Sequence, residues 1–215
     1  MNYILFDGPS RNNLLPFTFT RPVADIRIGI LTIREKWEAY LDFTTTTVTE
    51  DYLSDKFPMV EMDENIMINA SFLPNQTLAE MVKNLEANQA IFNNEDVIAF
   101  YTKDTQDDID FDAYEAIEYV DDVLKIEHTW DIFSKNGEAI QEDFELLTKG
   151  RQSQPIPEMT VAFNRSDIFI EEGAKLPLCS LNAENGPIYI GKNAEIMEGS
   201  MIRGPFALCE GATVK

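Results

Sequence analysis

Hydrophobic positions in the last quarter of the chain recur every six residues, at Ile190, Ile196, Ile202, Leu208 and Val214. A period of six fits neither the 3.6-residue repeat of an amphipathic helix nor the two-residue alternation of a half-buried strand. Glycines and other small residues recur in the same frame. This pattern is typical of a parallel β-helix, in which each hexapeptide supplies one short strand and one corner. We therefore predict a hexapeptide-repeat β-helix over residues 168–215.

An earlier pair, Ile170 and Leu176, has the same six-residue interval but lies two residues out of phase with the later run. A small corner insertion around residues 177–187 would reconcile the two frames. Repeat arrays generally need about three units and a cap to be stable. Because the sequence stops at Lys215 in mid-repeat, we expect these residues to be the front of a longer protein.

The first 150 residues show a different pattern, in which short apolar runs alternate with amphipathic segments. The predicted strands are residues 2–6, 44–49, 65–70 and 96–101. Capping boxes at Thr32 and Thr77 predict helices after each, and a third helix is expected over 130–149. Such alternation favours a mostly parallel α/β sheet with helices on its faces, a Rossmann-like arrangement.

A polar connector that contains prolines separates these two patterns. We therefore predict an α/β domain over residues 1–150, a linker over 151–167 and the β-helix over 168–215.

Composition excludes several classes of protein. The net charge of −21 repels nucleic-acid backbones and anionic membrane surfaces, so neither is an expected partner. The sequence has no apolar run long enough to span a membrane and no basic segment at its start, so we expect a cytoplasmic protein. Cys179 and Cys209 are interpreted as reduced thiols. The carboxylate-rich segment 104–122 lacks calcium-loop spacing and is interpreted as a solvated surface.

The charge is unevenly distributed along the chain. Residues 1–37 carry a net charge of +2 and hold the cations Arg11, Arg21, Arg27, Arg34 and Lys36. A cationic segment in so acidic a chain indicates a site for a small, multiply charged anion, because arginine matches phosphate geometry with two parallel donors. The alternative is that these arginines form structural ion pairs with nearby acids.

A long loop, residues 8–22, follows the first predicted strand. In open α/β sheets ligands bind at the carboxyl ends of the strands, so this loop is the expected binding region. The sequence contains no P-loop motif and no G-x-G-x-x-G motif. His128 is the only histidine, which excludes a histidine-rich metal cluster and favours a capping or surface role.

The opening segment combines Ile4-Leu5-Phe6-Asp7-Gly8, Arg11, Leu15-Pro16-Phe17-Thr18 and Arg21-Pro22. With the β-helix pattern behind it, the chain resembles the sugar-1-phosphate nucleotidyltransferases. The likeness is strongest to the bifunctional N-acetylglucosamine-1-phosphate uridylyltransferase/glucosamine-1-phosphate acetyltransferase family, which carries a left-handed β-helix. This resemblance implies transfer of a nucleotidyl group from an NTP to a sugar 1-phosphate with Mg²⁺ assistance. It also implies homotrimers of the full-length protein.

The resemblance also implies roles for individual residues. Arg11 and Arg21 would be catalytic, Arg27 and Lys36 would bind the sugar phosphate, and Asp7 would hold the metal ion. The nucleotide would be bound by Phe6, Asp7, Gly8, Arg11 and Asn69.

The sequence departs from the family pattern at three places. The family's lysine would fall on Val23, and Arg21 precedes its proline where that lysine follows one. Gly8 stands alone in the loop and is followed by Pro9, which has no N–H to offer a phosphate. Asn69-Ala70 stands where the family has a glycine and a metal-binding aspartate. Two alternatives therefore stay open: a sugar-nucleotide-binding or assembly domain without turnover, and an acyltransferase whose active site lies in β-helix coils beyond Lys215.

Overall fold

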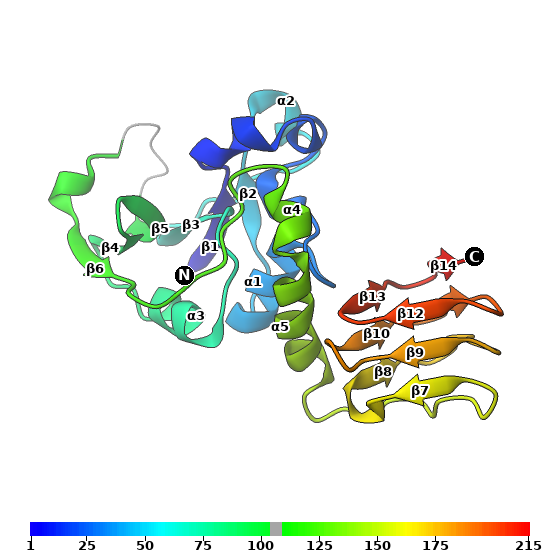
Figure 1. The fold of residues 1–215 in the computed structure, drawn as a ribbon. Coiled ribbons are helices and arrows are strands. Elements are labelled where there is room, and N and C mark those ends of the chain that lie inside the picture. The colour runs from blue at the N-terminus through cyan, green and yellow to red at the C-terminus, as the bar shows by residue number, and fades with distance from the viewer. Residues whose placement is uncertain (104–108) are drawn as a thin grey trace. The chain divides into compact units, whose positions relative to one another are not determined.

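The computed structural model describes residues 1–103 and 109–215 of the chain. These residues form two compact units, each described separately below (Figure 1). Unit 1 comprises Met1–Arg27 and Leu31–Ile132, and unit 2 comprises Ile28–Ile30 and Phe133–Lys215. No helix among the described residues has both the length and the apolar character needed to cross a membrane.

Unit 1 is built on a six-stranded sheet with the order β2-β1-β3-β5-β4-β6. Its strands are β1 (Asn2–Phe6), β2 (Thr46–Val48), β3 (Asn65–Asn69), β4 (Gln89–Asn93), β5 (Asp96–Thr102) and β6 (Glu115–Glu118). Strand β1 pairs in parallel with β2 and β3, and β4 pairs in parallel with β6. Among the strands that the structure describes in this sheet, only β5 runs antiparallel to its neighbours. The predicted mostly parallel α/β sheet is therefore confirmed.

Helical segments connect these strands. They are the 3₁₀ turns η1 (Pro9–Leu14), η2 (Phe17–Phe19), η3 (Val23–Asp25) and η4 (Phe111–Ala113), and the helices α1 (Ile33–Leu41), α2 (Asp51–Ser54) and α3 (Gln76–Lys83). Helix α4 (Asp131–Ser134) follows the last strand of the sheet. The capping box of α1 is confirmed, because the Thr32 hydroxyl accepts from the Glu35 N–H and the Glu35 carboxylate accepts from the Thr32 N–H. The predicted cap at Thr77 is wrong. Asn75 caps α3 by accepting from the Leu78 N–H at 2.9 Å.

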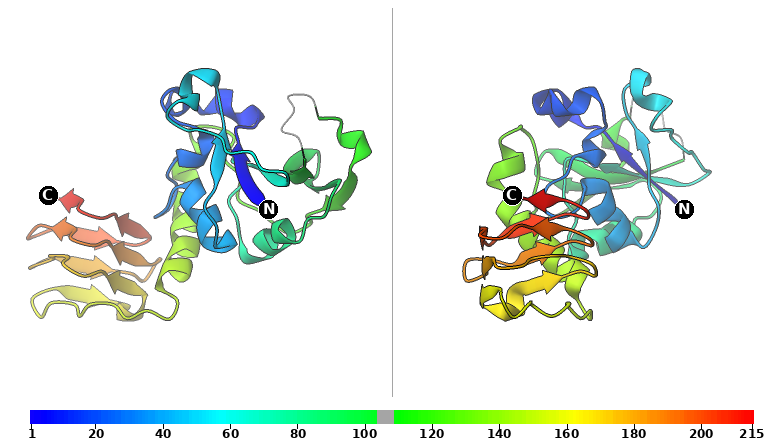
Figure 2. Two further views of the ribbon diagram at one scale, coloured as in Figure 1. Left: turned by 180° about the vertical axis from the view of Figure 1, so that it is seen from behind. Right: turned by 90° about the vertical axis from the view of Figure 1, so that its right-hand side faces the viewer.

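Unit 2 contains three short sheets in which every pairing is parallel: β8-β10-β13, β7-β9-β12 and β11-β14 (Figure 2). The strands are β7 (Val161–Phe163), β8 (Ile168–Ile170), β9 (Ser180–Asn182), β10 (Ile188–Ile190), β11 (Glu195–Ile196), β12 (Met201–Arg203), β13 (Phe206–Leu208) and β14 (Thr213–Val214), with the 3₁₀ turn η5 (Arg165–Asp167) before β8. The aliphatic residues spaced six apart share one core, with Val214 at its edge. The prediction of stacked parallel strands is confirmed.

The change of phase has a structural explanation. By register, Ile168 pairs with Ile188, 20 residues on, whereas Ile188 pairs with Phe206, only 18 residues on. In the longer coil, residues 183–187 form the corner between β9 and β10. The equivalent corner of the next coil, between β12 and β13, consists only of Gly204 and Pro205. The extra residues therefore fall inside the predicted insertion at 177–187.

One face of these coils is covered by α5 (Asn136–Thr148). Ile140 packs in an apolar cluster with Phe169 of β8 and Tyr189 of β10. This packing assigns α5 to unit 2, which begins earlier in the chain than the predicted β-helix; the predicted domain limits 1–150, 151–167 and 168–215 stay a prediction. The predicted helix over 130–149 is two helices, α4 and α5, separated by Lys135.

A three-residue segment, Ile28–Ile30, also belongs to unit 2 although it precedes α1 in sequence. The Gly29 N–H donates to the Asn136 side chain at 2.8 Å, and the Ile30 N–H donates to the buried Asp143 carboxylate at 2.7 Å. Gly29 has φ of +79°, and a Cβ there would lie 2.4 Å from Asp143 Oδ2. A glycine is therefore required for this segment, called the strap below, to lie against α5.

Candidate functional site

One edge of the unit 1 sheet gathers the carboxyl ends of its parallel strands. In register, Phe6 of β1 lies beside Val48 of β2 and Asn69 of β3. The residues that follow these strands are therefore neighbours, and β5 begins at the same edge because it runs the other way. This edge is where ligands bind in open α/β sheets.

Arg11 is the centre of a buried polar network at this edge. Its side chain is 9% exposed, and it reaches partners in the segments that follow β1 and β2. These partners are the Asp7 carboxylate, the Thr49 hydroxyl at 3.2 Å, the Thr18 carbonyl at 2.7 Å, the Tyr52 hydroxyl at 3.0 Å and the Glu50 carboxylate at 3.4 Å. The guanidinium group is thus bonded to other groups of the protein, and it orders the loop that follows β1.

Asp7, the predicted metal ligand, is the main anionic partner of Arg11. Its Oδ1 accepts from the Val23 N–H at 2.7 Å, and its Oδ2 accepts from the Thr49 hydroxyl at 2.6 Å as well as from Arg11. A search of residues 1–103 and 109–215 finds no group of three histidine, cysteine or carboxylate side chains placed to hold a metal ion. Asp7 as a metal ligand and Mg²⁺ dependence therefore both stay predictions.

Gly8 and Asn69 lie in direct contact across the ends of β1 and β3. A Cβ at Gly8 would come 2.7 Å from Asn69 Oδ1, so close approach rather than positive φ requires the glycine. The Asn69 amide donates to the Val97 carbonyl at 3.1 Å and accepts from the Ser71 N–H at 3.0 Å. Asn69 thus joins the end of β3 to the start of β5.

The remaining predicted site residues are Arg27, Lys36, Phe6 and Arg21. Arg27 lies 3.5 Å from Glu35, and Lys36 is buried in α1 at 2% exposure. Phe6 is half-buried in an apolar cluster, with its ring 5.9 Å from that of Phe100. Arg21 is exposed and has no hydrogen-bond or ion-pair partner among the residues that the structure describes.

The two interpretations of the cationic segment therefore apply to different residues. Arg11 pairs with Asp7, Arg27 with Glu35 and Arg34 with Asp25, as structural ion pairs would. The structure brings Phe6, Asp7, Gly8, Arg11 and Asn69 together at the sheet edge. Arg27 lies near Glu35, and Lys36 is buried in α1. Arg21 remains the candidate for an anion.

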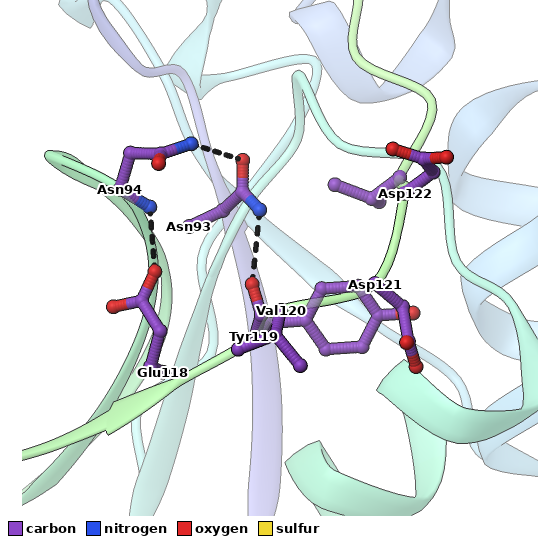
Figure 3. Close-up of a pocket in the computed structure, with 8 residues that line it drawn as sticks. Asn93, Asn94, Glu118, Tyr119, Val120, Asp121 and Asp122 are labelled. Atoms are coloured by element: carbon purple, nitrogen blue, oxygen red, sulfur yellow. Dashed lines mark hydrogen bonds between the residues drawn. The ribbon is translucent and has the colours of Figure 1, made fainter.

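A pocket of about 350 Å³ lies farther along the same edge, at the carboxyl ends of β4 and β6 (Figure 3). Its walls carry amide and carboxylate groups: the Asn93 side chain donates to the Tyr119 carbonyl at 3.0 Å, and the Glu118 carboxylate accepts from the Asn94 N–H at 2.9 Å. The lining residues are Asn93, Asn94, Glu118, Tyr119, Val120, Asp121, Asp122 and Val123. Such walls suit hydroxyl groups, which can donate to carboxylates, and disfavour phosphates.

Sequence reasoning missed this pocket because it predicted neither β4 nor β6. The acidic run 104–122 was interpreted as a solvated surface, and its described carboxylates are exposed: Asp110, Asp112, Glu115, Glu118, Asp121 and Asp122. Asp104, Asp107 and Asp108 lie outside the described residues. Alternation in 115–118 is too short and too acidic to indicate a strand by itself.

His128 lies in a turn before α4. Its backbone N–H donates to the Asp131 carboxylate at 2.9 Å, as does that of Glu127. Its ring stacks on Trp130, with ring centroids 4.3 Å apart. This arrangement is that of a histidine in a capping turn, in line with the sequence interpretation.

Comparison with known proteins places this geometry in context. A family model described as sugar nucleotidyl transferase matches residues 3–152, which include nearly all of the unit 1 sheet and its carboxyl edge. No curated protein matches the chain.

Proposed function

The chain belongs to the sugar nucleotidyl transferase family, and on that premise we propose that it transfers a nucleotidyl group from an NTP to a sugar 1-phosphate. The products are a nucleotide sugar and pyrophosphate. The observation that carries this proposal is the family match itself, which spans more than half of the chain and covers the strand ends described above.

The reaction forms one P–O bond and breaks another. A phosphate oxygen of the sugar 1-phosphate attacks the α-phosphorus of the NTP, and the bond from that phosphorus to the bridging oxygen breaks as pyrophosphate leaves. Negative charge on the transferring group must be neutralised. In this proposal Arg21 supplies a positive charge, because its guanidinium group has no partner among the described residues. Arg11 is then a positioning residue that orders the loop.

The sugar is assigned to the pocket at β4 and β6. Its carboxylates and amides can exchange hydrogen bonds with hydroxyl groups, and its volume of about 350 Å³ is in the range of small-molecule sites. Asn69 links the two parts of the edge, since it contacts Gly8 on one side and the Val97 carbonyl of β5 on the other. The nucleotide is assigned to the side near Gly8.

We keep Mg²⁺ as a proposed cofactor that arrives with the triphosphate, because Mg²⁺ is commonly bound largely through substrate phosphates. No side chain is assigned to it here. We also propose that the coils of unit 2 are a left-handed hexapeptide β-helix, that this part supports homotrimers in the full-length protein, and that the protein is cytoplasmic. The six-residue period and the three parallel sheets support the β-helix.

A second candidate is a domain that binds nucleotide sugars without turnover. One observation favours it: the acid after β1, Asp7, is paired with Arg11, and the residue at the end of β3 is the amide Asn69. Binding and turnover therefore have to be measured separately.

The decisive experiment combines the purified protein and Mg²⁺ with each pairing of five NTPs and a panel of sugar 1-phosphates. We expect pyrophosphate only when both substrates are present, with the nucleotide sugar detected by mass spectrometry. Arg21→Gln should lower kcat/KM by roughly 100-fold, because a charge that stabilises the transition state is lost. Arg203→Gln, at an exposed arginine on β12, is the matched control and should leave kcat/KM unchanged.

Two results would overturn transferase activity. One is no pyrophosphate from any pairing with folded protein; calorimetric binding of the nucleotide sugar would then support the second candidate. The other is pyrophosphate release without a sugar 1-phosphate, which would indicate NTP hydrolysis.

A further inference from the structure

Three large aromatic side chains near the end of β1 are exposed to solvent. Phe17 and Phe19 of η2 are 49% and 58% exposed, and Tyr52 of α2 is 63% exposed. We call these three residues the aromatic rim. Large exposed aromatic groups that lie together commonly mark a binding surface.

The rim is held together by the buried Arg11. One guanidinium nitrogen, Nη2, donates both to the Thr18 carbonyl and to the Tyr52 hydroxyl. The Tyr52 hydroxyl therefore lies beside the backbone between Phe17 and Phe19. Figure 1 shows α2 and the turns after β1 at the same end of the strands.

The same network fixes the rim relative to the strand ends. Arg11 is paired with Asp7, which directly follows β1, and the Thr18 hydroxyl donates back to the Arg11 carbonyl at 3.0 Å. Arg11 and Thr18 are buried at 7% and 0% exposure, although both lie in a loop. The rings are thus presented on an ordered support rather than on a loose loop.

Arg21 adds a charge to this surface. It lies two residues after Phe19, it is exposed, and the described part of the chain offers it no hydrogen-bond or ion-pair partner. In a chain of net charge −21, an exposed arginine that pairs with none of the described acids favours the binding of an anion. Exposed rings, followed two residues after Phe19 by an arginine without a partner among the described residues, match a ligand that combines a planar ring with negative charge.

We propose that the aromatic rim stacks on the base of the NTP while Arg21 contacts its phosphates. This inference rests on the proposed function, and it adds the residues that hold the base. Stacking on aromatic rings tolerates different bases, because every base has a π-face. The rim therefore contributes affinity for nucleotides in general, and the choice among bases lies elsewhere.

The test separates the base from the phosphates with two probes. Calorimetry measures the affinity of each variant for each of five NTPs and for inorganic tripolyphosphate, which carries the charge but has no base. Tyr52→Leu, Phe17→Leu and Phe19→Leu should each weaken NTP binding by about tenfold and leave tripolyphosphate binding unchanged. Arg21→Gln should weaken binding of both probes.

Two controls sharpen the comparison. Tyr52→Phe keeps the ring but loses the hydroxyl that Arg11 binds, so its NTP affinity should fall less than that of Tyr52→Leu. Phe163→Leu removes a ring of similar exposure, 50%, from β7 in unit 2 and should change neither affinity.

Several outcomes would overturn the inference. If the rim variants bind NTPs as tightly as the wild type, the rim does not hold the base. If the same variants still release pyrophosphate, the proposed function survives. Equal weakening of NTP and tripolyphosphate would mean that the rim only supports the loop. A wild-type dimer in sedimentation that the rim variants dissociate, with NTP affinity unchanged, would assign the rim to a second copy of the chain. NTP binding that depends on the rim, without turnover, would instead support the inference and refute the transferase.

Discussion

Different interactions order the loop region after β1 in unit 1 and the stacked coils of unit 2. Around Arg11 the contacts are polar, and they join its own loop at Thr18 to the segment after β2 at Thr49 and Tyr52. In the coils the buried groups are aliphatic, and the same contact recurs with each turn of chain. The comparison shows that the loops around the candidate site are ordered by individual hydrogen bonds and ion pairs. The coils are instead ordered by apolar packing that repeats from one coil to the next.

The two regions should also respond differently to substitution. Removing one member of a buried ion pair leaves the other charge without compensation. Removing part of a buried aliphatic side chain leaves a cavity, whose cost depends on how far the neighbours relax. The following predictions test this contrast, in order of decreasing effect.

The largest effect is expected for Arg11→Ala. Asp7, whose side chain is 6% exposed, would lose its cationic partner in a buried site. The free energy of unfolding in urea should fall by about 3–5 kcal/mol. Arg21→Ala is the matched control and should change it by no more than about 0.5 kcal/mol, because Arg21 is exposed. Similar small losses in both variants would show that Arg11 does not order the loop.

The second effect concerns the core of the coils. Ile196 is fully buried among the aliphatic residues of unit 2, so Ile196→Ala should lower the free energy of unfolding by about 3 kcal/mol. Met201→Ala, at a side chain that is 87% exposed, should alter it by less than about 0.5 kcal/mol. An equal effect of the two substitutions would contradict inward packing of the six-residue repeat.

The smallest effect is a pH dependence at Tyr189, where α5 covers the coils. Burial, and then its hydrogen bond to Glu171 at 2.7 Å, raise the pKa of the Tyr189 hydroxyl above its ordinary value of 10.0. The associated stability is complete below pH 10 and is lost as the pH rises towards the raised pKa, because the unfolded chain ionises first. Tyr189→Phe should cost about 1 kcal/mol at neutral pH.

Above pH 10, the unfolding free energy of the wild type should fall more steeply with pH than that of Tyr189→Phe, by up to about 1.4 kcal/mol per pH unit. Urea titrations at a series of pH values measure both slopes. Parallel slopes would mean that the hydroxyl is as solvated in the folded protein as in the unfolded chain.

Local signals made much of this fold predictable. The bounds of β1 and the capping box at Thr32 follow from nearby residues alone, and the period of six marks the buried face of the coils. Short, partly polar strands such as β4 and β6 give no such signal. They are ordered by pairing with β5 and with each other, which sequence periodicity does not report.

The candidate site was less predictable for the same reason. The sequence indicated the loop after β1 as the binding region, but it did not distinguish a buried arginine from an exposed one. The difference between Arg11 and Arg21 depends on Thr49 and Tyr52, which lie 38 and 41 residues from Arg11 in the chain. No spacing rule links those positions, so both arginines were assigned to the ligand.

The strap has a consequence for how the polypeptide can be divided and synthesised. Ile28–Ile30 leaves the ribosome long before Asn136 and Asp143, the side chains that receive its N–H groups. A nascent chain that has reached only the end of unit 1 would therefore hold Ile30 without its apolar neighbours on α5. Cleaving the protein at residue 150, although it follows the sequence pattern, would cut between α5 and the strands that it covers.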